Sequence, residues 1–217
     1  MYRYFRKEYF KSPDIKGNWR DAWSKISFRI EFIISSILIL GMVEFINWYF
    51  PIIQLRDGRF INDPIVGIIP PVDLSWATFI VMYAVVISGL IYLVYRPKQL
   101  LILFQSVLLI TMTRMCTLYL FPLEPPLGII PLEDPILGKL VYSSKLITKD
   151  LFFSGHTVMV FMFFLIVRQP FLKALFLLAT ILVGSFVIIQ HVHYSFDVIV
   201  APLFSWIIYK IIVIAHR

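Results

Sequence analysis

The chain has 217 residues, of which 59% are hydrophobic and only 15% are charged, and its formal net charge is +7. Soluble domains carry about 25% charged residues, so this composition excludes an ordinary soluble domain, and its high hydrophobicity excludes a disordered chain. A single cysteine excludes an internal disulfide and a multi-cysteine metal site. The basic residues gather at the chain start and beside apolar stretches, which indicates contact with anionic lipid head groups rather than with nucleic acid.

The predicted elements are an interfacial segment followed by six apolar spans. Residues 1–27 are basic and aromatic, which is typical of an amphipathic segment at a membrane surface, and their charged region is too long for a signal peptide. Six stretches then approach or exceed the roughly 20 apolar residues of a transmembrane helix: 28–50, 74–95, 100–121, 152–167, 171–190 and 198–215. We therefore predict an all-α integral membrane protein with one six-helix domain over residues 28–215.

The distribution of lysine and arginine predicts the orientation of these spans. Eight of these residues lie before the first span or at its start, and six more lie at the second-to-third turn, the fourth-to-fifth turn and the C-terminal end. The opposite side has five, all within the two long connections, 51–73 and 122–151. The positive-inside rule then places both termini in the cytosol and both long connections at the non-cytosolic face.

Histidines and an aspartate gather at that predicted non-cytosolic face. His156 begins the fourth span. His191, His193 and Asp197 lie between the fifth and sixth spans. If this stretch is already helical, the Asp197 carboxylate and the His193 imidazole share one face. A carboxylate on one ring nitrogen fixes the tautomer and leaves the other nitrogen free to attack, and a second histidine can serve as general acid. We predict that His156, His193 and Asp197 are catalytic, because ionisable residues near membrane depth default to functional roles.

Two other interpretations of these polar residues stay open. Polar side chains at helix ends can serve only as caps, which is the simplest explanation for any one of them alone. A zinc ion could also be bound by His191, His193 and Asp197 together with His156, although a His-x-His pair suits a strand better than a turn. No further ligands are obvious in the sequence, so we expect no metal and no other cofactor.

A second group of polar residues is predicted to contact the substrate. Arg114 lies well inside the third span, where its guanidinium could bind a phosphate in bidentate fashion or form an ion pair, for example with Glu44. Asp150 could orient a catalytic group or hold a head-group amine, and Asp73 stands at a helix start, where aspartate usually caps. The candidates for binding the phosphate or head group are Arg114, Asp150, His191, Asp73 and Tyr194.

Four stretches resemble motifs of the sphingomyelin synthase family, a branch of the phosphatidic acid phosphatase type 2 (lipid phosphate phosphatase) superfamily. They are PPVD at 70–73, RMCTLY at 114–119, DLFFSGHTVM at 150–159 and HVHYSFDVIVA at 191–201. The resemblance covers the six-span core, roughly residues 28–215. The chain departs from the eukaryotic enzymes in having only about 27 residues before its first span, and Arg96-Pro97 lacks the lysine of the phosphatase pattern Lys-x6-Arg-Pro.

This resemblance implies a six-helix fold with an exoplasmic active site and a triad formed by His156, His193 and Asp197. His193 would be the nucleophile that forms a phosphohistidine with the head group, Asp197 would orient it, and His156 would act as acid and then as base. His191 matches a histidine next to the triad. The compact form suggests a bacterial inner-membrane protein, or a Golgi or plasma-membrane protein if it is eukaryotic.

The resulting functional expectation is a sphingomyelin synthase-like phosphotransferase. It would move phosphocholine or phosphoethanolamine from a glycerophospholipid to ceramide or another lipid alcohol, such as a diacylglycerol-type acceptor, and release diacylglycerol. Its partners would be these lipids and the bilayer, and not nucleic acid. One alternative is a lipid phosphatase or phospholipase C-like hydrolase with the same triad and water as acceptor. A lipid transporter or scramblase is disfavoured, because transport has no need of the triad.

Overall fold

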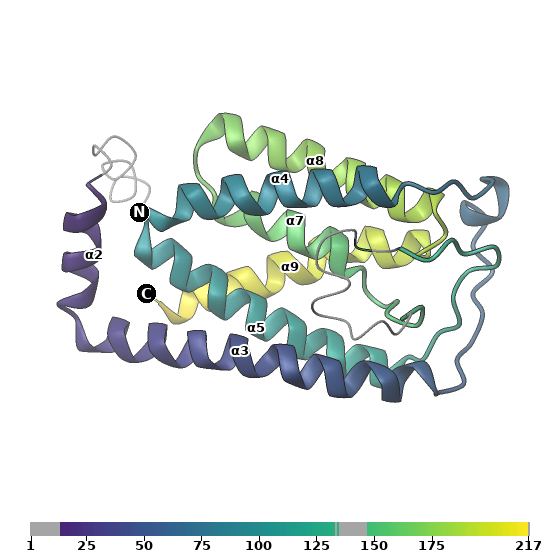
Figure 1. The fold of residues 1–217 in the computed structure, drawn as a ribbon, viewed down its shortest axis with the longest axis horizontal. Coiled ribbons are helices and arrows are strands. Elements are labelled where there is room, and N and C mark those ends of the chain that lie inside the picture. Colours follow the sequence, from purple (N-terminus) through teal and green to yellow (C-terminus); the bar gives the residue numbers. More distant parts are fainter. Residues whose placement is uncertain (1–13, 133, 135–146, 217) are drawn as a thin grey trace.

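The computed structural model describes residues 14–132, 134 and 147–216, and the part of the interfacial segment before residue 14 lies outside these ranges. The described chain is built from α-helices, joined at one end of the molecule by long non-helical connections (Figure 1). The helices are α2 (Ile15–Trp23), α3 (Ile26–Gln54), α4 (Ser75–Val94), α5 (Pro97–Leu120), α7 (Gly155–Ile166), α8 (Pro170–Ile189) and α9 (Ser195–Ala215), with a short 3-10 turn η1 (Val66–Ile68) in the first long connection.

Five of these helices are long and apolar enough to cross a membrane: α3, α4, α5, α8 and α9. The chain is therefore a multi-pass integral membrane protein. The predicted fourth span, residues 152–167, is instead the 12-residue helix α7. Twelve residues rise about 18 Å, which is well short of the roughly 30 Å hydrocarbon thickness. The residues before α7 are non-helical because the side chain of Ser154 caps the helix start by accepting from the amide of Thr157.

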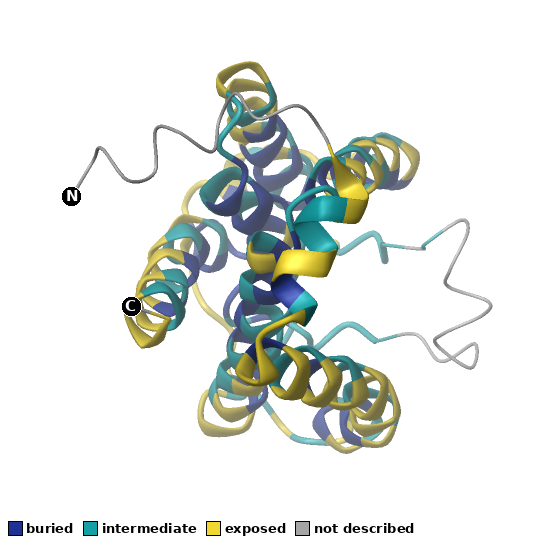
Figure 2. Cartoon of the chain, turned by 90° about the vertical axis from the view of Figure 1, so that its left-hand side faces the viewer, coloured by how far each residue is buried: buried dark blue, intermediate teal, exposed yellow. Residues whose placement is uncertain are grey.

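The short helix α7 is tolerated because it lies among the other helices. It packs against α8, α9, α4 and α5, and the non-helical residues Leu151, Phe153 and Ser154 before it are at most 1% exposed. Non-helical backbone at membrane depth is stable only where protein covers it. The outward faces of the surrounding helices are exposed, as the yellow parts of Figure 2 show. Many of these exposed residues have large apolar side chains, as expected for lipid contact.

Helix boundaries differ from the predicted spans where packing overrides a local signal. Pro51 is predicted to end the first span, yet α3 continues through it to Gln54. A proline inside a helix removes one hydrogen bond, but continuing the helix buries Ile53 against Tyr49 and Leu118. The third helix begins at Pro97 rather than at residue 100, because proline suits the first turn of a helix.

The end of the bundle opposite the long connections is covered by α2, which runs across it in Figure 1. The indole of Trp19 donates to the carbonyl of Val94 at 2.8 Å, and the amide of Asn18 donates to the carbonyl of Tyr95 at 2.9 Å. These carbonyls terminate α4 and have no partner within that helix. The helix α2 therefore caps α4, and its place at a membrane surface stays a prediction.

The two long connections pair with each other at the other end. The amide of Arg59 donates to the carbonyl of Pro122, and the amide of Glu124 donates back to the carbonyl of Arg59, both at 3.0 Å. The ammonium of Lys149 bonds to the Glu124 carboxylate at 2.7 Å and to the carbonyl of Arg56. The helices α7 and α9 begin beside these connections, so the connections position the first residues of both helices.

Candidate active site

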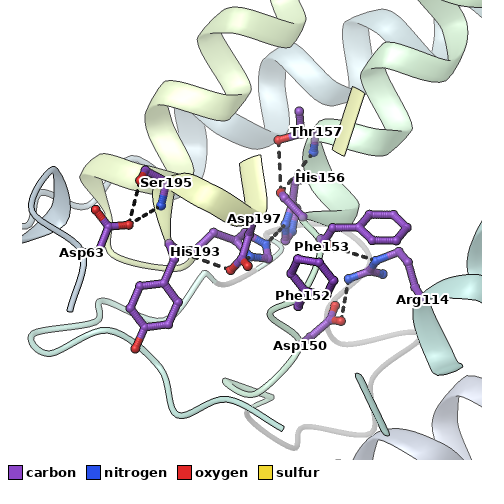
Figure 3. Close-up of polar contacts among 12 residues, drawn as sticks. Asp63, Arg114, Asp150, Phe152, Phe153, His156, Thr157, His193, Ser195 and Asp197 are labelled. Carbon is purple, nitrogen blue, oxygen red and sulfur yellow. Dashed lines mark hydrogen bonds and ion pairs between the residues drawn. The ribbon is translucent and has the colours of Figure 1, made fainter. Parts of the chain in front are cut away.

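The starts of α7 and α9 bring two histidines together from separate parts of the chain (Figure 3). His156 is the second residue of α7, and His193 lies in the turn between α8 and α9. The Nδ1 atom of His156 is 3.4 Å from the Nε2 atom of His193. His193 is fully buried. A hydrogen bond between these two nitrogens requires one ring to present an N–H group and the other a bare nitrogen.

Asp197 lies behind His193, on the side away from His156. Its Oδ2 atom is 3.6 Å from Nδ1 of His193, which is within ion-pair distance and slightly longer than a hydrogen bond. Both residues are fully buried, and within the described part of the chain neither Nδ1 of His193 nor Oδ1 of Asp197 has a hydrogen-bond partner. A closer approach of a few tenths of an ångström would join these two groups by a hydrogen bond.

The backbone around Asp197 explains how it is held. Helix α9 begins at Ser195, earlier than the predicted residue 198, so Asp197 lies in the first helical turn and His193 just before it. The Asp197 carboxylate accepts from the amide of Tyr194 at 3.2 Å, and negative charge is stabilised at a helix N-terminus. The Asp197 carbonyl accepts from the amide of Ser154 at 3.1 Å. This bond ties the start of α9 directly to the start of α7.

Arg114 reaches the same region from α5. Its Nη2 atom bonds to Oδ1 of Asp150 at 2.6 Å, and its Nε atom donates to the carbonyl of Phe153 at 2.9 Å. The guanidinium lies against the backbone of Gly155, where a Cβ atom would come within 2.6 Å of Nη1. The partner of Arg114 is therefore Asp150 and not Glu44, which is exposed on α3. Only glycine at 155 lets the guanidinium approach the start of α7.

Asp63 is a site-supporting residue that the sequence did not suggest. Its Oδ2 atom accepts from both the amide and the hydroxyl of Ser195, at 2.6 and 2.8 Å, and its Oδ1 atom accepts from the amide of Ile65 at 2.9 Å. Burial alone would raise the pKa of Asp63, but these hydrogen bonds outweigh it and lower the pKa below its ordinary value. The first connection thereby holds the first residue of α9, two residues before Asp197.

Three predicted substrate-binding residues have their polar atoms engaged by the protein. Asp73 accepts from the amide and hydroxyl of Ser75, which caps α4 and lowers the pKa of Asp73. The Tyr194 hydroxyl donates to the carbonyl of Glu124 at 2.9 Å, so this buried ring links the α8–α9 turn to the second connection. The pKa of Tyr194 is raised chiefly by its burial. The ring of His191 contacts carbonyl groups of both connections.

The structure thus assembles part of the predicted site. It brings together His156, His193 and Asp197, with the Arg114–Asp150 pair beside the start of α7. It does not assemble the alternative zinc site, because no group of three possible ligands is in place for a metal among the described residues. The head-group roles of Asp73, His191 and Tyr194 stay predictions.

This geometry defines a class: a multi-pass membrane protein with a buried histidine–histidine–aspartate cluster at one end of its helices. Residues 149–214 match the family model described as PAP2 superfamily C-terminal. The matched region contains Asp150, His156, His193 and Asp197, and it leaves Arg114 and the preceding helices outside. No curated protein matches the chain. The similarity to that superfamily therefore rests on the part of the chain that carries the cluster.

Proposed function

We propose that the chain is an integral membrane phosphotransferase that moves a phosphoalcohol head group from a glycerophospholipid to a lipid alcohol through a phosphohistidine. The observation that carries this proposal is the cluster of Asp197, His193 and His156 in that order, with one ring nitrogen of His193 facing the carboxylate and the other facing His156. The match of residues 149–214 to the PAP2 superfamily C-terminal model supports the same type of chemistry.

In the first proposed step, His193 is the nucleophile. Its Nε2 atom attacks the phosphorus of the donor lipid while Asp197 holds the proton on Nδ1 and stabilises the charge that develops on the ring. The bond between phosphorus and the diacylglycerol oxygen breaks, and His156, which enters this step protonated on both ring nitrogens, gives that oxygen one proton and becomes neutral. The Nε2 atom of His193 is 3.4 Å from Nδ1 of His156, so a phosphoryl group bonded to Nε2 must separate the two rings. The products are diacylglycerol and phosphorylated His193.

In the second proposed step, the roles of His156 reverse. Its ring, now neutral, takes the proton from the hydroxyl of the acceptor as that oxygen attacks phosphorus. The nitrogen–phosphorus bond breaks, the head group leaves on the acceptor, and His193 regains its lone pair. In both steps the bonds that form or break join phosphorus to His193 or to a substrate oxygen. The proton moves between His156 and the substrates. Because both steps are in-line displacements, positioning and charge stabilisation dominate the catalysis.

The proposed phosphate site lies at the start of α7. The amides of Gly155 and His156 at the start of the helix have no intrahelical acceptor and favour an anion, and Arg114 lies against Gly155 in that turn. The guanidinium presents several donors in one plane, which suits two phosphoryl oxygens. Its bond to Asp150 holds it in place before substrate arrives.

A cationic head group fits the charges near this site. Asp134 in the second connection is bonded to the hydroxyl of Tyr83 at 2.6 and 2.8 Å. Asp134 and Asp150 both lie within electrostatic reach of His156. Because Asp150 is paired with Arg114, Asp134 is the carboxylate that would favour a zwitterionic head group such as phosphocholine or phosphoethanolamine. Ceramide, or a diacylglycerol-type alcohol, is the proposed acceptor, and the site is proposed to face the non-cytosolic side.

The test uses the purified chain in liposomes that contain phosphatidylcholine or phosphatidylethanolamine and fluorescent ceramide. Chromatography and mass spectrometry would follow diacylglycerol and any new phosphosphingolipid. We expect both products from the wild type and from a His216→Ala control at the opposite end of the bundle, and neither product from His193→Ala. Diacylglycerol with free phosphoalcohol would instead show a hydrolase. Lipid movement that survives in His156→Ala and His193→Ala would show a transporter and refute the proposed enzyme.

A further inference from the structure

The ring of His191 lies between the two long connections. Its Nδ1 atom is 2.8 Å from the carbonyl oxygen of Leu127, and its Nε2 atom is 2.8 Å from the carbonyl oxygen of Ile69. The residue is only 5% exposed. Its backbone has φ 60°, a left-handed conformation that is uncommon outside glycine but that histidine adopts more readily than most residues. The turn thus directs this ring into the connections rather than toward the His156–His193 pair.

Both contacts of His191 require an N–H donor, and a neutral ring has only one. A carbonyl oxygen can only accept a hydrogen bond, whereas a neutral imidazole has one N–H group and one bare nitrogen. A neutral ring would therefore satisfy one carbonyl and set a lone pair against the other at 2.8 Å. An imidazolium carries a proton on both nitrogens and donates to both carbonyls, and hydrogen bonds from a charged donor are the stronger kind.

We propose that His191 is held as an imidazolium that clamps both connections onto the turn carrying His193, and that it acts as a positioning residue. Its catalytic consequence rests on the proposed function, whereas the clamp itself does not. Neutralising the ring would release one of the two carbonyls and loosen the connection that carries it.

Neighbouring bonds show what the clamp would hold in place. The amide of Ile130 donates to the carbonyl of Gln190 at 3.1 Å, and the amide of Val72 donates to the carbonyl of Ile189 at 3.3 Å. The side-chain oxygen of Gln190 accepts from the amide of Leu74 at 3.0 Å. Both connections are therefore bonded to the end of α8 immediately before His191. Among these links, the ring of His191 contacts both connections at once.

Charged groups on the surrounding elements are engaged elsewhere. On the first connection, Asp63 bonds to Ser195 and Asp73 to Ser75. On the second connection, Glu124 pairs with Lys149. On the turn itself, His193 faces His156 and Asp197. Within the described ranges no carboxylate contacts the ring of His191, so its two carbonyl partners are what would hold the second proton.

The test is nitrogen-15 NMR of the histidine side chains in the full chain reconstituted in liposomes. The spectra are recorded in a His156→Gln background, because the proposed mechanism also uses a doubly protonated His156. We expect one imidazole with both nitrogens protonated at pH 7.5, where an ordinary histidine is mostly neutral. This signal should be lost when His191→Gln is added and retained when His216→Gln is added. A neutral His191 ring with one bare nitrogen at pH 7.5 would overturn the proposal. The His156→Gln spectrum alone shows whether a doubly protonated ring is present, should the double variant with His191→Gln fail to fold.

Hydrogen exchange provides a second readout. Loss of one hydrogen bond from a charged donor should lower the protection of the Val72 or Ile130 amide at least about tenfold in His191→Gln, and raising the pH of the wild type should lower protection beyond the intrinsic rate. Unchanged protection in both cases would count against the clamp. If the NMR signal is found but no donor lipid is turned over, the proposed function fails and the clamp stands. If donor lipid is turned over but the doubly protonated signal is not found, the clamp fails and the proposed function stands.

Discussion

Substituting Gly155 by alanine should separate Arg114 from the start of α7. The new Cβ atom would lie 2.6 Å from Nη1, 2.7 Å from Cζ and 3.0 Å from Nη2 of the guanidinium. The shortest ordinary contact is 3.4 Å, so the guanidinium must move by about 0.8 Å or more. That movement strains or breaks the bonds to Asp150 and to the carbonyl of Phe153, which are 2.6 and 2.9 Å long.

The expected cost follows from those bonds. A hydrogen bond to a charged group contributes about 1.5–3 kcal/mol, and each 1.36 kcal/mol of lost transition-state stabilisation is a factor of ten in rate. If one bond is lost and Arg114 leaves the phosphoryl group, kcat/KM should fall about 10- to 150-fold. The assay is the initial rate of diacylglycerol release in liposomes, with thermal unfolding measured in parallel to confirm that the variant folds.

The matched control is Gly41→Ala. Gly41 lies on the exposed side of α3, and a Cβ atom there would meet nothing within 4 Å. This control should keep the wild-type rate. If the Gly155 variant is folded and as active as the Gly41 variant, the guanidinium does not need its place against α7, and the assignment of Arg114 to the phosphate site is wrong.

Three further substitutions test the groups around the triad. Asp197→Asn should keep the fold and lower kcat by roughly 10³- to 10⁴-fold, because an amide cannot hold the correct tautomer of His193; a rate near wild type in the liposome assay would contradict this role. Asp63→Ala leaves the buried amide and hydroxyl of Ser195 without their acceptor, which costs about 1–3 kcal/mol of stability for each donor. Both the unfolding temperature and the rate should fall. Unchanged values would exclude Asp63 as a support for α9. The hydrogen bond from Lys149, together with the amide of Gly58, lowers the pKa of Glu124 below 4.5. The stability that it contributes is therefore present above pH 4.5 and is lost as the pH falls through the lowered pKa. In the wild type, the protection of the connection amides relative to their intrinsic exchange rate should therefore fall in acid, and Glu124→Gln should abolish that dependence.

The apolar length signal predicted most of the fold, because a membrane span is specified by local composition. The five long helices fall on predicted spans, and the shortness of the stretch 152–167 was visible in the sequence. The apolar length did not predict the helix ends, because packing against residues distant in the sequence determines where a helix begins and ends. Helix α3 continues through Pro51 because Ile53 is buried against α5. The residues near position 51 in the sequence do not indicate that contact. The number of spans and their orientation stay predictions.

The site divides in the same way between local and distant information. The pairing of His193 with Asp197 could be predicted because four residues separate them, and the start of the fourth span suggested His156. The partner of Arg114 is 36 residues away across a proline-rich connection, so the sequence left its ion pair open. Asp63 bonds to Ser195 across 132 residues, and no motif marks either residue. The long-range polar bonds that join the connections to the helices were therefore the part that could not be predicted from the sequence.

The surroundings of the histidine pair bear on which acceptor the phosphohistidine would meet. The ring of Phe79 lies edge-on to His156, with 6.4 Å between centroids. On the other side, Phe153 stacks on Phe204 at 4.3 Å, and Phe152 stacks on Phe196 at 5.7 Å. Aromatic side chains around a reacting centre exclude water and strengthen the electrostatic interactions within it. Water is the acceptor in hydrolysis, whereas a lipid alcohol enters from an apolar phase. The burial of His193 and the Phe79 ring beside His156 are therefore the physical reason for proposing transfer between lipids rather than hydrolysis by the same triad.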